Sequence, residues 1–86
     1  METSKTIKLP AADKEITFNA PTLGVVRAAL HDVKNKTELD VIAIIIAKCC
    51  NIREEELNTY DFRDIGVLSK VARGFLDEAG MSEMVQ

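Results

Sequence analysis

The feature that most constrains this chain is an uninterrupted apolar run at residues 41–47, which reads VIAIIIA. The run fills about two turns of an α-helix. Thr37 is a favoured N-cap residue, and Asp40 stands three positions later in an arrangement like a capping box. Lys48 follows the run, where a positive charge suits the C-terminal end of a helix. The β-branched residues would also suit a strand, but the segment is longer than a typical strand, so we predict one helix over residues 37–50.

A helix that is apolar on every side must be covered on every side. The chain has 86 residues, and a domain of this size buries only about 60–65% of the surface of its unfolded chain. We therefore expect part of the cover of this helix to come from another molecule, with a homo-oligomer as one source. We do not interpret the apolar run as a transmembrane span, because spanning a membrane needs about 20 apolar residues.

Two short segments with alternating apolar side chains precede this helix, at residues 6–9 and 15–19. A turn-like segment at residues 10–14 joins them, and this pattern predicts a β-hairpin. Its apolar face would carry Ile7, Leu9, Ile16 and Phe18. Because an isolated hairpin is only marginally stable in water, we expect that face to pack on helices.

Another helix is predicted between the hairpin and the central helix. It begins after the N-cap residue Thr22 and runs over residues 23–33, with Asn35 as a left-handed C-cap. The link to Thr37 is very short, so the two helices should form an antiparallel helical hairpin. The expected apolar stripe of this first helix comprises Leu23, Val26, Ala29, Leu30 and Val33.

Two helical segments are predicted after the central helix. Three glutamates at residues 54–56 suit the start of a short helical turn, which Ile52 and Leu57 would anchor. A last helix begins after Asp61 and ends at Gly80, which is a natural stop. Its expected apolar stripe comprises Phe62, Ile65, Leu68, Ala72, Phe75 and Leu76, with Val71 at the edge.

These elements together predict an α+β fold that is mainly α. An N-terminal β-hairpin packs on about three helices, with a short extra helical turn. The chain is long enough for one domain, which we place at residues 1–80. Residues 81–86 are expected to form a mobile C-terminal tail.

No group of residues in the sequence has the composition of a catalytic site. His31 is the only histidine, and it stands beside Asp32 near the end of a helix, where a histidine is usually solvated. Cys49 and Cys50 are adjacent, which is neither a disulfide framework nor a set of zinc ligands. We interpret them as small core residues of a protein in a reducing compartment. We therefore expect no enzymatic activity, no metal and no cofactor.

The net charge of the chain indicates which classes of partner it can bind. A net charge of −3 and a pI of about 5.1 argue against a dedicated nucleic-acid-binding protein, whose surface is usually basic. Residues 1–10 are mostly polar and do not resemble a signal peptide. We therefore expect a cytoplasmic protein with no nucleic-acid partner and no membrane association.

One face of the last helix carries Arg63, Gly66, Lys70, Arg73 and Gly74. A solvated basic face is the simpler interpretation. The glycines allow a second one, because each costs a helix about 1 kcal/mol relative to alanine, and that cost is tolerated where a partner backbone comes close. On this hypothesis, replacing either glycine by alanine stabilises the monomer and weakens partner binding. Asp61 and Asp64, near the start of the same helix, are interpreted as helix caps rather than as a catalytic pair.

Three stretches of the chain resemble a known family. Residues 16–24, ITFNAPTLG, combine a strand with a Pro–Thr pair that opens a helix. Residues 51–57, NIREEEL, form an acidic turn that ends in leucine, and residues 60–64, YDFRD, lead into the last helix. In their order and spacing, over most of the chain, they resemble the small tail assembly chaperones of contractile-tailed phages of the Mu-like type. The chain departs from them at Asn19, where relatives often have arginine, and at Asn51, where they often have glycine.

The resemblance implies a non-enzymatic role in tail morphogenesis in the host cytoplasm. Such proteins bind the tape measure protein, keep it soluble and bring tail tube subunits to it, and they are absent from the mature virion. Many are also made in a longer form by translational frameshifting, whose extension contacts the tail tube protein, and this sequence would correspond to the short form. A chaperone for a long helical chain needs apolar surface of its own. The candidate contact residues are Ile44, Ile45 and the surface of the last helix.

Two other functions stay open at the level of the sequence. A small helical DNA-binding regulator would place the basic last helix on DNA, although Glu54, Glu55 and Glu56 before it would repel phosphate. A structural adapter subunit of a phage or prophage assembly would instead persist in mature particles. A carrier protein is less compatible, because Ser69 lies in the middle of the predicted helix rather than at its start.

Overall fold

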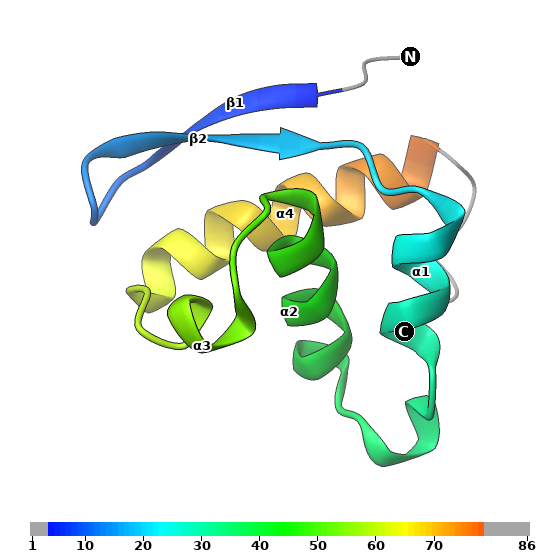
Figure 1. Ribbon diagram of the computed structural model, residues 1–86. Helices are drawn as coiled ribbons and strands as arrows, with labels where there is room; N and C mark the ends of the chain where they lie inside the picture. Colours follow the sequence, from blue (N-terminus) through cyan, green and yellow to red (C-terminus); the bar gives the residue numbers. More distant parts are fainter. Residues whose placement is uncertain (1–3, 79–86) are drawn as a thin grey trace.

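The computed structural model of the protein describes residues 4–78. Its elements, in chain order, are β1 (Ser4–Leu9), β2 (Lys14–Asn19), α1 (Leu23–Leu30), the 3-10 turn η1 (Val33–Asn35), α2 (Glu38–Cys49), α3 (Glu54–Leu57) and α4 (Phe62–Glu78). The fold is α+β and mainly α, with an antiparallel hairpin followed by helices, which confirms the predicted class (Figure 1). The predicted helix stop at Gly80 and the predicted tail at residues 81–86 lie outside the described residues.

The central helix α2 forms where the sequence predicts it. The Thr37 hydroxyl accepts a hydrogen bond from the Asp40 amide at 3.1 Å, and the Asp40 carboxylate accepts one from the Thr37 amide at 3.0 Å. This reciprocal pair is a complete capping box. At the other end Asn51 is left-handed, and the Ile52 amide donates to the Ala47 carbonyl at 2.8 Å, which is the bond of a Schellman motif. Both ends of the helix are therefore satisfied locally.

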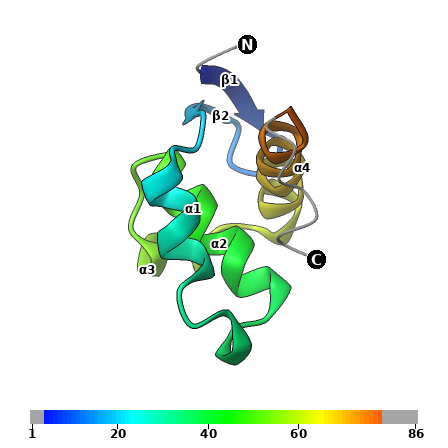
Figure 2. The ribbon, with the colours of Figure 1, turned by 90° about the vertical axis from the view of Figure 1, so that its right-hand side faces the viewer.

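Most of the surface of α2 is covered by the rest of the same chain. The buried residues of this helix are Val41, Ile42, Ile45, Ile46, Ala47 and Cys49. The helices α1, α3 and α4 and the strand β2 all contact it (Figures 1 and 2). We expected another molecule to cover part of this helix. The apolar residue of α2 that is most exposed, and so most open to such cover, is Leu39 in the first turn.

The hairpin lies across α2 and α4, because β2 contacts α2 and β1 contacts α4 (Figure 2). Its register pairs Ile7 with Ile16, so the predicted apolar positions share one face. Leu9 and Phe18 on that face are fully buried, while Ile7 and Ile16 are half-buried. The Phe18 ring stacks on the Phe75 ring of α4 with a centroid distance of 5.7 Å. As predicted, the hairpin gains its cover from helices.

The first helix is shorter than predicted. It ends at Leu30 because the C-cap residue His31 is extended, and left-handed Asp32, with φ of 55°, then begins the 3-10 turn η1. The prediction of Asn35 as a left-handed C-cap is therefore wrong, because the C-cap is the extended residue His31 and Asn35 lies in η1. As predicted, α1 runs antiparallel to α2 (Figure 1). Of the predicted stripe, the structure buries Val26 and Ala29 and leaves exposed Leu23 and Val33.

The last helix packs through most of its predicted stripe. Buried in it are Leu68, Ala72, Phe75 and Leu76. Phe62 was predicted to belong to the same stripe, and that prediction is wrong, because this residue is 79% exposed. The rotation of about 100° per residue carries Phe62 roughly 60° past Ile65, on the side of the stripe that faces solvent. This displacement shapes the groove described next.

Candidate functional site

An apolar groove lies between α2 and α4, and α3 contributes to one of its sides. Its first part has a volume of about 240 Å³. The residues that line this part are Leu39, Ile42, Ala43, Leu57, Asn58, Tyr60, Phe62 and Ile65. The lining comes from α2, from the end of α3 and the segment that follows it, and from the first turns of α4. We call this feature the α2–α4 groove.

The groove continues along α4 beyond this first part. A second hollow of about 300 Å³ is lined by Glu38, Leu39, Ile42, Ser69 and Arg73. The two hollows share Leu39 and Ile42, so they are adjacent, and we include both in the α2–α4 groove. On α4 the groove extends from Phe62 to Arg73, which corresponds to about 16 Å along the helix axis. That length matches about three turns of another α-helix.

Two large apolar side chains stand exposed beside the groove. Leu39 is 57% exposed and Phe62 is 79% exposed. Leu39 belongs to the first turn of α2, which the capping box fixes, and Phe62 is the first residue of α4. Asp61 caps α4 there, because its carboxylate accepts a hydrogen bond from the Arg63 amide at 2.8 Å. Both apolar side chains are therefore presented by capped helix ends.

The two contact residues that the sequence suggested on α2 differ in how deeply they are buried. Ile45 is fully buried in the core, and Ile44 is half-buried against it. Neither residue lines the two described parts of the groove. The closed fold therefore does not offer Ile45 to a partner. Leu39, which the sequence did not single out, is the exposed apolar residue of α2 at the groove.

The predicted basic face of α4 does turn toward solvent. Arg63 forms an ion pair with Asp61 at 3.0 Å, and Arg73 forms one with Glu38 across the groove. The hydrogen bonds from Arg63 lower the pKa of the Asp61 carboxyl below its ordinary value. Lys70 is exposed and forms no ion pair within residues 4–78. Two of the three cations are thus neutralised within the chain.

The two glycines of this face have no packing role among residues 4–78. A Cβ atom added at Gly66 or at Gly74 would meet no other atom within 4 Å, beyond the backbone of its own helix. Gly66 is exposed, and Gly74 is half-buried. Alanine therefore fits at both positions, as the sequence-based hypothesis on their substitution requires.

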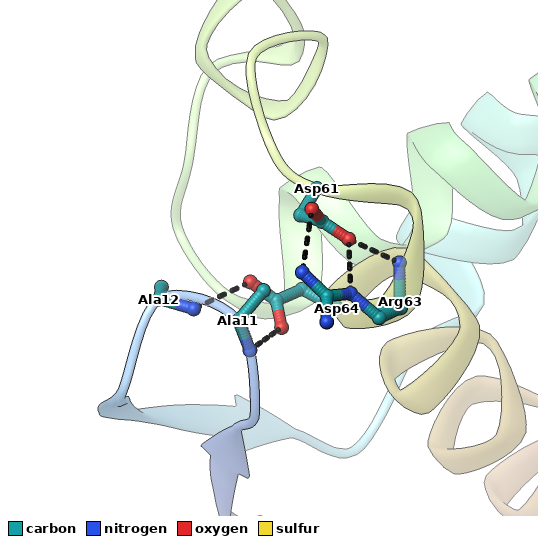
Figure 3. A network of polar contacts seen from close by, with 5 residues as sticks. All are labelled: Ala11, Ala12, Asp61, Arg63 and Asp64. Atoms are coloured by element: carbon teal, nitrogen blue, oxygen red, sulfur yellow. Dashed lines mark hydrogen bonds and ion pairs between the residues drawn. The ribbon is translucent and has the colours of Figure 1, made fainter.

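Asp64 has a role that the sequence analysis did not predict. Asp64 is only 1% exposed. Its carboxylate accepts hydrogen bonds from the backbone amides of Ala11 at 2.8 Å and Ala12 at 3.1 Å. Figure 3 shows these contacts beside the cap that Asp61 provides for α4. The interpretation as a cap is right for Asp61 and wrong for Asp64, which holds the turn of the hairpin. We call this contact the Asp64 clasp.

The two cysteines are buried, as predicted for core residues. Burial raises the pKa of the Cys49 thiol to about 11 and that of the Cys50 thiol to about 12, with Cys49 adding to the rise at Cys50. Both thiols are therefore protonated and unreactive at neutral pH. In the described part of the chain no group of three or more His, Cys, Asp or Glu side chains is placed to hold a metal ion. His31 is exposed.

The groove is suited to binding another helix. An apolar groove with protruding apolar side chains on its rim can receive the apolar face of an amphipathic helix. No family model, curated protein or solved structure matches the chain. Among residues 4–78 no helix is long and apolar enough to cross a membrane.

Proposed function

We propose that this chain is a non-enzymatic phage tail assembly chaperone, which binds the tape measure protein and helps recruit tail tube subunits to it. It acts in the host cytoplasm and is absent from the mature virion. A longer frameshifted form of the chain contacts the tail tube protein. The likeness of residues 16–24, 51–57 and 60–64 to the Mu-like chaperones supports the assignment to tail assembly.

The observation that carries the binding role is the pair of exposed apolar side chains beside the α2–α4 groove. Leu39 and Phe62 expose 57% and 79% of their surface next to a hollow that is itself largely apolar. Burying one such side chain contributes about 1.5–3 kcal/mol. A helix of about three turns would cover both and fill the groove. Tape measure proteins are long helical chains with apolar stripes, so they offer such segments.

The charges around the groove give less support to the DNA-binding alternative. Glu54, Glu55 and Glu56 are exposed on α3, immediately before the basic helix. They would approach phosphates together with α4 and repel them. Of the cations on α4, Arg63 and Arg73 are already paired with carboxylates of the same chain.

The experiment is co-expression with the tape measure protein encoded nearest this gene, followed by pull-down and light scattering. We expect the wild-type chain to copurify with a soluble tape measure protein. The double variant Leu39→Ser and Phe62→Ser should lose this effect, with at least a tenfold loss of affinity for each side chain that is no longer buried. Leu23→Ser is the matched control, because Leu23 is 66% exposed on α1, whose residues do not line the groove.

Two results would contradict the proposal. In the first, the tape measure protein aggregates equally with and without the wild-type chain. In the second, the double groove variant copurifies as well as the Leu23→Ser control does. Persistence of the chain in purified mature particles would instead identify a structural adapter subunit.

A further inference from the structure

We propose that the turn of the hairpin, residues 10–14, holds in place the end of the α2–α4 groove where Phe62 stands, so that helix binding depends on a part of the chain outside the groove. No hairpin residue lines either hollow of the groove. Two contacts nevertheless join the turn to the groove, one through Asp64 and one through Tyr60. This step rests on the function proposed above, because it concerns how tightly the groove binds a helix.

The first contact is the Asp64 clasp. In the first turn of α4, Asp64 stands between Phe62 and Ile65, which both line the groove. The backbone amides of Asp64 and Ile65 donate to the Asp61 carbonyl at 3.0 Å and 3.2 Å, and these bonds close the turn. The buried Asp64 carboxylate accepts both of its hydrogen bonds from the hairpin turn (Figure 3). The hairpin therefore holds the segment of α4 that carries two groove residues.

The second contact is made to the ring of Tyr60. Tyr60 lines the first hollow of the groove, and it also lines a separate hollow of about 300 Å³ beside the hairpin turn. The Lys14 ammonium lies 5.3 Å from the centre of this ring, in a cation–π contact. The Tyr60 hydroxyl donates a hydrogen bond to the Glu56 carboxylate at 3.3 Å. The ring is thus held from the hairpin and from α3 together.

These contacts order one end of the groove before a partner binds. A helix end frays readily, because its first amides have no partner within the helix. Without the clasp, binding would have to order the first turn of α4, and the cost of that ordering weakens the complex. The cost of fixing the backbone of one residue corresponds to about a tenfold loss of affinity. The clasp should therefore increase the affinity of the groove without contacting the bound helix.

The first test is the substitution Asp64→Ala. The affinity is measured by fluorescence anisotropy on a labelled helical segment of the tape measure protein, with every variant shown by circular dichroism to be folded. Asp64→Ala should bind this segment about tenfold more weakly than the wild type. Val26→Ala is the matched control for lost stability, because it opens a cavity at a buried residue of α1, which does not line the groove. It should keep the wild-type affinity.

The second test leaves Asp64 in place and carries the experiment if Asp64→Ala does not fold. Lys14→Ala removes the cation from the Tyr60 ring, changes no groove residue and should weaken binding about threefold. Lys48→Ala is its control, because Lys48 is an exposed lysine of α2 that does not line the groove. Wild-type affinity in folded Asp64→Ala or in Lys14→Ala overturns the inference. So does an equal loss of affinity in the matching control.

A measurement without any partner separates this inference from the chaperone proposal. The Ile65 amide, bonded to the Asp61 carbonyl, reports on the first turn of α4 through its hydrogen exchange. It should exchange faster in Asp64→Ala than in Val26→Ala. Equal exchange in the two variants overturns the inference even if the tape measure protein binds. Faster exchange in Asp64→Ala, in a chain whose wild type does not bind the tape measure protein, supports the positioning by the hairpin and refutes the chaperone proposal.

Discussion

The substitution Asp64→Ala removes the carboxylate that holds the hairpin turn against α4. The amides of Ala11 and Ala12 then lose hydrogen bonds of 2.8 Å and 3.1 Å. A hydrogen bond to a charged group contributes about 1.5–3 kcal/mol. Because both bonds are only partly buried, water compensates for some of the loss, and the lower value applies to each. We expect the free energy of unfolding to fall by about 3 kcal/mol.

This loss is large for a chain of this length, whose total stability should be about 4–13 kcal/mol. A domain of this size loses roughly 4–8 °C in Tm for each kcal/mol, so the Tm should fall by about 12–24 °C. Asp64→Asn keeps one acceptor oxygen and removes the charge, and it should cost about half as much. Asp77→Ala is the matched control, because it removes an exposed carboxylate from the same helix. It should stay within about 0.5 kcal/mol of the wild type.

Urea denaturation followed by far-UV circular dichroism measures these differences. Amide hydrogen exchange adds a local measurement, because the Ala11 and Ala12 amides should be protected in the wild type and exchange faster in Asp64→Ala. A loss below about 1 kcal/mol together with unchanged exchange at both amides would show that the clasp does not stabilise the fold. A loss as large in Asp77→Ala would show that the effect is one of helix charge only.

The remaining predictions concern the helices and the thiols. Gly66→Ala and Gly74→Ala should each raise the free energy of unfolding by about 1 kcal/mol in urea denaturation, because alanine lowers the cost of the helical backbone and a Cβ meets no atom within 4 Å; a loss of stability would show a hidden steric contact. Thr37→Ala breaks the capping box of α2 and should cost about 1 kcal/mol in the same assay, and no change would mean that the cap is dispensable. Burial raises the pKa of Cys49 and Cys50 from 9.0 to about 11 and about 12, so the protonated thiols stabilise the fold fully below pH 9 and lose this effect as the pH rises through 11 and 12. The free energy of unfolding, measured as a function of pH, should therefore fall above pH 9. The prediction is contradicted if a variant with alanine at both cysteines loses as much stability above pH 9 as the wild type does.

The parts of the fold that the sequence predicts correctly depend on short-range signals. The capping box between Thr37 and Asp40 lies within four residues, and the apolar run follows it directly. The hairpin is predicted from alternating side chains and a turn, and its register requires only neighbouring residues. The residues that define such an element lie within the element itself, so the α+β class can be predicted from the sequence.

The groove could not be predicted, because it depends on how separate elements pack. The exposure of Phe62 depends on how α4 packs on the rest of the chain, which the helical pattern alone does not define. Asp64 and Ala11 are 53 positions apart, and an aspartate near a helix start is usually a cap. For the same reason Ile45 looked available in an apolar run, whereas α1, α4 and the hairpin cover that run. The helical spacing predicted Phe62 within the stripe and Val71 at its edge, so it gave no signal that Phe62 is exposed.

The contacts between the hairpin and α4 also determine when the chain can fold during synthesis. The hairpin leaves the ribosome first, but its apolar residue Phe18 packs on Phe75, and its turn is held by Asp64. Neither contact can form until α4 has been translated. The fold is therefore reached through non-local contacts after most of the chain has emerged, which slows folding relative to a helical bundle of local contacts. Until then Phe18 lacks the ring on which it packs, and the turn of the nascent hairpin lacks its carboxylate.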